Sequence, residues 1–167
     1  MKRVLSVSIL ALLAVAPLGA GAQTAGGMSA MQYYVGKWNC MGGPTTAPAI
    51  PATIVYAYDT GNSVMRSTLD VPPATNFPGF NSTGALTWDA KNNWYVQFGL
   101  DSAGNWSVSH APAPTGNKES WTDVATNDNK LGRSEAIRTD QNNYTYIGYE
   151  SANATAPNFK ATCKRVM

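Results

Sequence analysis

The sequence predicts an all-β protein that folds as a single antiparallel up-and-down β-barrel of about 8–10 strands. Short runs with strand character follow one another from residue 37 to residue 164, and Asp, Asn and Gly residues that favour tight turns separate them. In several runs both alternating faces carry aromatic or polar side chains. A barrel with a lined interior explains this pattern better than a sandwich with one dry face.

Ten runs have strand character, and a short helical turn at Met31–Val35 precedes the first. In the run Trp94–Leu100, alternation places Trp94 and Phe98 on one face and Tyr95 and Gln97 on the other. The expected strands are Lys37–Cys40, Thr53–Asp59, Ser63–Leu69, Gly84–Asp89, Trp94–Leu100, Asn105–Ser109, Glu119–Thr126, Gly132–Arg138, Tyr144–Glu150 and Asn158–Lys164.

The first residues have the features of a secretory signal peptide. Lys2 and Arg3 precede an apolar run from Leu5 to Leu18, which is shorter than the roughly 20 residues of a membrane-spanning helix. Ala20-Gly21-Ala22 offers the small residues of a cleavage site before Gln23. We therefore expect residues 1–22 to be removed, residues 23–30 to be a flexible lead-in, and residues 31–167 to form the barrel of a periplasmic or secreted protein without a membrane span.

Charge excludes some partners. The chain has 12 Lys and Arg residues against 10 Asp and Glu residues, and Lys2 and Arg3 would leave with the signal peptide. The mature protein is then formally neutral and has no basic runs, which argues against nucleic-acid binding and against electrostatic docking on anionic membranes. Oligomeric state is left open by the sequence.

The two cysteines, Cys40 and Cys163, lie near the two ends of the mature chain. Export would deliver them to an oxidising compartment, where a disulfide is favoured. A reactive thiol is the alternative, but the chain has one histidine and no C-x-x-C motif beside these cysteines.

The segment Val35-Gly36-Lys37-Trp38-Asn39-Cys40 and the segment Thr162-Cys163-Lys164-Arg165 resemble the two ends of calycin barrels, the class of lipocalins and nitrobindin-like proteins. The resemblance is to exported bacterial members of uncharacterised function. It implies that Gly36 bends the chain into the barrel floor, that Trp38 plugs the closed end, and that Lys164 or Arg165 packs over Trp38; we assign Arg165. It also implies that the first and last strands are neighbours, with the cysteines joining the seam. The string Thr122-Asp123-Val124 is the nearest match to a mid-chain lipocalin motif and carries no weight.

The expected function is to bind one small, largely apolar ligand inside the barrel. Inward-pointing arginines could bind a carboxylate head group. The candidate ligand-binding residues are Tyr56, Arg66, Trp94, Trp106, Trp121, Arg133 and Tyr146.

Other functions stay open. They are a structural or inhibitory module that acts through Pro-rich rim loops, and a cyclase- or isomerase-like calycin enzyme. We assign no catalytic residue, no metal ligand and no cofactor, and expect a binding protein rather than an enzyme. A nitrobindin-like reading would make His110 a haem ligand, but its position beside the Pro-containing stretch Ala111–Pro114 favours a rim histidine.

Overall fold

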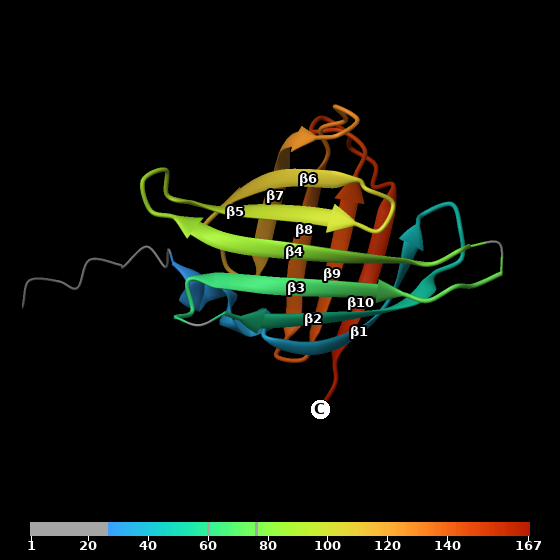
Figure 1. Ribbon diagram of the computed structural model, residues 1–167, viewed down its shortest axis with the longest axis horizontal. Coiled ribbons are helices and arrows are strands. Elements are labelled where there is room, and N and C mark those ends of the chain that lie inside the picture. The colour runs from blue at the N-terminus through green and yellow to red at the C-terminus, as the bar shows by residue number, and fades with distance from the viewer. Residues whose placement is uncertain (1–26, 60, 76) are drawn as a thin grey trace, which may run out of the picture.

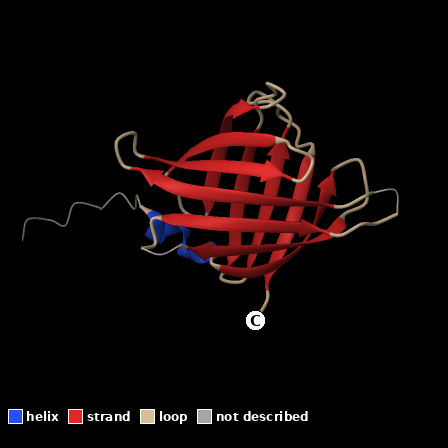
Figure 2. Ribbon diagram, viewed as in Figure 1, coloured by secondary structure: helices blue, strands red, loops and turns tan. Residues whose placement is uncertain are grey.

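The computed structural model describes residues 27–59, 61–75 and 77–167. A short 3₁₀ helix precedes ten strands, which close into one antiparallel barrel (Figures 1 and 2). The predicted fold class is confirmed, and each of the ten expected runs falls on one strand. The elements are η1 (Met28–Tyr34), β1 (Gly36–Pro44), β2 (Ile50–Tyr58), β3 (Val64–Val71), β4 (Phe80–Asp89), β5 (Trp94–Asp101), β6 (Trp106–Pro112), β7 (Lys118–Thr126), β8 (Arg133–Asp140), β9 (Asn143–Tyr149) and β10 (Phe159–Arg165).

Helix η1 closes one end of the barrel. Met28, Met31 and Tyr34 recur every third residue, the period of a 3₁₀ helix, and therefore lie on one face. Met31 and Tyr34 are buried on this face among core side chains of the barrel. The chain then turns at Gly36, whose φ of 123° lies in a region that favours glycine.

The first and last strands meet and close the sheet. Strand β1 pairs with β10, and this register sets Cys40 opposite Cys163 and Trp38 opposite Arg165. The two cysteines form a disulfide across the seam, in agreement with the expected pairing. In Figure 1, β2 to β6 cross the front of the view and β7 to β10 run steeply behind them.

On strand β5 the more polar face lies inside the barrel and the more apolar face lies outside. Tyr95 is fully buried and Gln97 lines the barrel interior, whereas Phe98 is 43% exposed on the outside. The apolar face of this strand, which includes Trp94 and Val96, therefore looks outward.

The predicted signal peptide and its cleavage site lie outside the described residues. Within the residues that are described, no helix has the length and apolar character needed to cross a membrane.

Candidate functional site

Two cavities with volumes of about 470 and 740 Å³ occupy the barrel interior. The smaller cavity is called the deeper one because it reaches η1, where Met31 and Tyr34 form part of its wall. It also extends along β8 to β10 as far as Arg133, Tyr149 and Asn158. The larger cavity reaches Pro44 and Phe77 in the segments between strands at the opposite end. The two are contiguous, since they share the lining residues Tyr56, Ser67, Gln97, Ser107, Tyr144, Tyr146 and Phe159.

The walls of this interior differ in polarity. On β2 to β4 the wall of the larger cavity is mainly apolar, with Ile54, Leu69 and Phe80 among its side chains. On β5 to β8 the wall of the smaller cavity is mainly polar, although Trp121 and Ala136 also line it. Its polar members are Gln97, Ser107, Ser109, Asp123, Arg133 and Ser134. The cavity as a whole therefore suits a molecule with an apolar body and a polar group.

The floor beneath the cavities is tightly held. The Trp38 side chain is fully buried, and its Nε1 donates a hydrogen bond of 2.7 Å to the Tyr34 carbonyl. The Arg165 guanidinium lies 4.2 Å from the Trp38 ring centroid, and it donates hydrogen bonds to the carbonyls of Val35 and Tyr33. The arginine thus ties the end of β10 to the segment that leads into β1.

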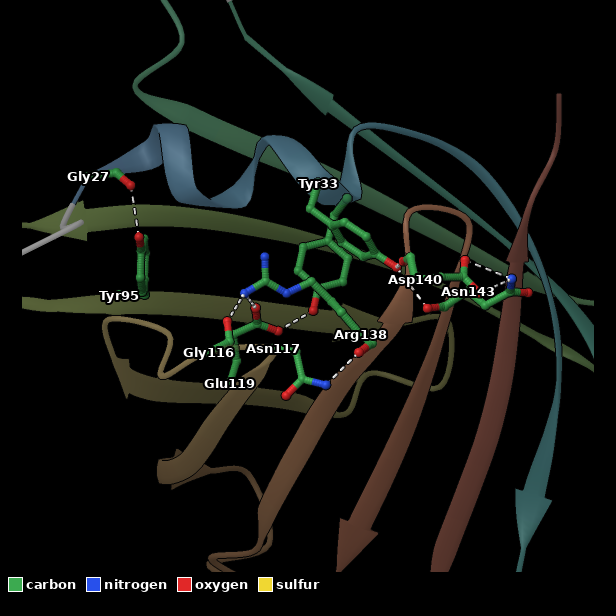
Figure 3. Close-up of polar contacts among 10 residues, drawn as sticks. Gly27, Tyr33, Tyr95, Gly116, Asn117, Glu119, Arg138, Asp140 and Asn143 are labelled. Atoms are coloured by element: carbon green, nitrogen blue, oxygen red, sulfur yellow. Dashed lines mark hydrogen bonds and ion pairs between the residues drawn. The ribbon is translucent and has the colours of Figure 1, made fainter.

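A buried carboxylate network underlies the deeper cavity (Figure 3). Glu119 is 1% exposed, accepts a hydrogen bond from the Tyr34 hydroxyl and lies 3.3 Å from Arg138 Nη2. Burial raises the pKa of the Glu119 carboxyl, while the Tyr34 hydroxyl and the Arg138 charge act in the opposite direction. Arg138 also donates to the Gly116 carbonyl at 2.9 Å, so the network joins η1, β7 and β8.

Four predicted ligand-binding residues line the cavities. Tyr56 and Tyr146 contribute to both, Trp121 to the deeper one, and Trp106 to the larger one near its mouth. Burial raises the pKa values of the Tyr56 and Tyr146 hydroxyls. These phenols therefore stay protonated and able to donate hydrogen bonds at neutral pH.

Three predicted ligand-binding residues are placed differently from the expectation. Trp94 and Arg66 line neither cavity; Trp94 belongs to the outward face of β5, and Arg66 is exposed between inward-facing neighbours on β3. Arg133 borders the deeper cavity, but its guanidinium is held by Glu135 at 3.0 Å and lies 3.4 Å from the Tyr149 ring centroid. Of the two expected arginines, Arg133 alone borders a cavity, and its guanidinium already has partners within the protein.

The histidine also lies away from the cavities. The His110 ring stacks on Trp94, with ring centroids 4.5 Å apart and an angle of 23° between the planes. It lines neither cavity. This side chain could not ligate a haem held inside the barrel, so His110 does not fit the alternative interpretation in which it is a haem ligand.

Sequence reasoning missed Asp123, whose carboxylate lines the deeper cavity. Its Oδ1 accepts a hydrogen bond of 2.6 Å from the Ser109 hydroxyl, and its Oδ2 accepts one of 3.1 Å from the Gly132 amide. The register between β6 and β7 shifts between Val108 and Ser109, and this irregularity sets Ser109 opposite Asp123. The alternation Ser107-x-Ser109 could have indicated this polar wall, because it places two small polar residues on the same face of β6.

Among the residues described, no group of three His, Cys, Asp or Glu side chains is placed to hold a metal ion. The fold and the interior together define a class: a closed antiparallel barrel of ten strands with a cavity that is polar on one wall and apolar on the other.

Solved structures share the fold. The chain is similar to the crystal structure of Rv2717c from M. tuberculosis, with a TM-score of 0.61 and 13% identity over 84% of this chain and 97% of that one. It is also similar to a redesigned β-barrel, with a TM-score of 0.45 and 8% identity over 83% of this chain and 96% of that one. No protein-family model and no curated protein matches the sequence.

Proposed function

We propose that the barrel binds one small, largely apolar molecule in its interior. The observation that carries the proposal is the pair of contiguous cavities inside the barrel, which share Tyr56 and Tyr146 as lining residues. The larger cavity has a volume of about 740 Å³. Binding cavities for small molecules typically measure about 300–1,000 Å³ and are mostly apolar with a few placed polar groups. The barrel interior is of this size, and it has an apolar wall on β2 to β4 and polar groups on β5 to β8.

The ligand enters through the end opposite η1. Helix η1 covers the other end, where Met31 and Tyr34 are buried and the Tyr33 hydroxyl donates to carbonyls of Asp140 and Asn143 in the turn between β8 and β9 (Figure 3). The larger cavity is lined at the opposite end by Pro44, Phe77 and Asn127, which belong to three different connections or strand ends.

A hydroxyl in the deeper cavity supports a polar contact with the ligand. Tyr144 is 3% exposed and lines both cavities, and its hydroxyl lies beside the hydroxyl of Tyr56, which also lines both. Since one hydroxyl of such a pair donates to the other, the second keeps its own proton for another acceptor. A ligand oxygen or nitrogen at this depth can therefore accept a hydrogen bond from it.

The test compares two adjacent residues on opposite faces of β5. Gly99 lies opposite Gly84 and lines the larger cavity, and a Cβ there would come no closer than 3.6 Å to a neighbouring side chain. Gly99→Leu should therefore fill the cavity without a backbone clash. Phe98→Ser, on the outer face, is the matched control.

The readout is the fluorescence of phenylnaphthylamine, a neutral apolar dye that brightens in apolar surroundings. We expect the wild-type protein and Phe98→Ser to bind the dye equally, and Gly99→Leu to bind it at least about tenfold more weakly. Circular dichroism checks that each variant keeps its strands. Equal binding by Gly99→Leu and the wild type, or loss of binding in Phe98→Ser alone, would place the dye outside the barrel and refute the proposal.

We further propose that the protein acts outside the cytoplasm. The disulfide between Cys40 and Cys163 is compatible with an oxidising compartment, and residues 1–22 have the pattern of a cleaved signal peptide. N-terminal sequencing of the protein recovered from a bacterial periplasm or medium should begin at Gln23. Recovery of the chain only in the cytoplasm, with Met1 retained, would contradict this.

A further inference from the structure

The polar wall of the interior indicates which kind of polar group the ligand carries. We propose that Asp123 binds a hydrogen-bond-donating head group, so that the ligand is an amphiphilic amine or alcohol rather than a fatty acid. This inference rests on the proposed function and adds a ligand class to it.

The Asp123 carboxylate is oriented by the protein and keeps capacity to accept more hydrogen bonds. Ser109 and Gly132 each supply it with one donor, at 2.6 and 3.1 Å. An ionised carboxylate has about four lone-pair sites, so about two remain for other donors. Because Asp123 lines the deeper cavity, a ligand there can reach those sites.

Gly132 is needed for this arrangement. A Cβ at residue 132 would lie 2.8 Å from the Tyr149 carbonyl and 3.1 Å from Asp123 Oδ2. Glycine therefore lets its amide approach the carboxylate closely, and together with Ser109 it fixes the orientation of Asp123.

The charges around the interior favour a cation over an anion. Among the described residues that line the two cavities, Arg133 is the one with a cationic side chain, and Glu135 and the carbonyl of Ala154 already hold its guanidinium. Asp101 and Asp128 line the larger cavity in addition to Asp123 in the deeper one. A ligand carboxylate would meet like charges on its path, whereas an ammonium group would be attracted.

The arrangement also gives the ligand an orientation. Asp123 lines the deeper cavity, and the apolar side chains of Leu69, Val71 and Phe80 line the larger cavity that reaches the open end. The head group therefore binds at the wall formed by β6 to β8, and the hydrocarbon chain lies against the apolar wall of β2 to β4.

The experiment compares three ligands that differ in their head group alone: decylamine, decanol and decanoate. Each is titrated near neutral pH, decylamine and decanoate below their micelle concentrations and decanol below its solubility limit. The readout is the tryptophan fluorescence of the wild-type protein, in which Trp121 lines the deeper cavity. We expect decylamine to bind most tightly and decanoate at least about tenfold more weakly than decylamine.

The variant Asp123→Asn removes the charge and keeps a side chain of nearly the same shape. It should weaken decylamine binding by about tenfold and change decanol binding by less than about threefold. Asp89→Asn, at the turn between β4 and β5 and away from both cavities, is the control and should change neither.

The outcomes separate the two proposals. If decanoate binds as tightly as decylamine, or if Asp123→Asn leaves the decylamine affinity unchanged, the barrel binds amphiphiles but the assignment of Asp123 is wrong. If none of the three ligands binds, the proposed function fails as well. Should Asp123→Asn not fold, the order of the three ligands on the wild-type protein decides alone.

Discussion

At the scale of single residues, Arg165 makes the contacts that hold the closed end together. Its guanidinium packs over the buried Trp38 ring and donates to two backbone carbonyls in the segment between η1 and β1. A hydrogen bond from a charged group contributes about 1.5–3 kcal/mol, and a cation–π contact adds about 0.5–2 kcal/mol.

Arg165→Met should therefore lower the free energy of unfolding by about 2–4 kcal/mol, and Arg165→Lys should recover less than half of this loss because a lysine cannot donate in two fixed directions. Urea unfolding monitored by circular dichroism measures both. Lys164→Met, at the exposed neighbouring position, is the control and should change the value by less than about 0.5 kcal/mol. A loss of similar size in both positions would contradict the role given to Arg165.

The residues of β5 show why the candidate site could be predicted only in part. Alternation separated Trp94 and Phe98 from Tyr95 and Gln97, but it does not say which face looks inward. The usual expectation that the more apolar face is buried fails here, because β5 belongs to the polar wall of the interior. Trp94 was therefore assigned to the ligand site and Gln97 was not.

At the scale of elements, the tight turns are stabilised by aspartates whose carboxylates accept hydrogen bonds from residues that follow them. Asp101 accepts from the amides of Ala103 and Asn105, each at 2.9 Å, and Asp140 accepts from the amide of Asn142 at 2.7 Å. The Asn105 side-chain amide, which also donates to Asp101 at 2.9 Å, and then the backbone hydrogen bonds hold the pKa of Asp101 below its ordinary range; the Asn142 amide does the same for Asp140. Such turns were predictable from sequence, because Asp and Asn favour local hydrogen bonds of this kind.

The lowered pKa values predict acid sensitivity. A carboxyl whose pKa is lower in the folded state contributes stability above its unfolded pKa, and this contribution is lost as the pH falls through the folded pKa. The ordinary value is 3.8, so the loss should begin near that pH and continue below it. The melting temperature of the wild-type protein should fall between about pH 5 and about pH 2 by more than that of the double variant Asp101→Asn, Asp140→Asn.

The exposed Glu150→Gln variant is the control for this comparison and should follow the wild-type curve. Identical acid curves for the wild type and the double variant would show that the turn aspartates do not contribute to the pH dependence.

At the scale of the whole molecule, the seam between β1 and β10 converts a sheet into a closed barrel. It joins residues that are 123 positions apart, at Cys40 and Cys163. The seam was expected from resemblance at the two chain ends, and the ten strands were expected from their spacing. The inner lining was predicted only in part, because register shifts such as the one between Val108 and Ser109 leave no clear trace in a single sequence.

The disulfide should contribute about 4–5 kcal/mol to the free energy of unfolding, because it closes a long loop of the unfolded chain. A reductant should lower the urea midpoint of the wild-type protein accordingly and leave the midpoint of the double variant Cys40→Ala, Cys163→Ala unchanged. A wild-type midpoint that does not respond to reductant, with reduction verified by thiol labelling, would contradict the stabilising role of the seam.

The most direct test of the central claim is to locate a ligand in crystals grown with an ω-bromo derivative of decanol. We predict an anomalous bromine peak inside the barrel, near Leu69 and Phe80 on the apolar wall, with the hydroxyl end directed toward Asp123. A peak on the outer face beside Phe98 and Val124, with none in the interior, would contradict the claim that the barrel interior is the binding site.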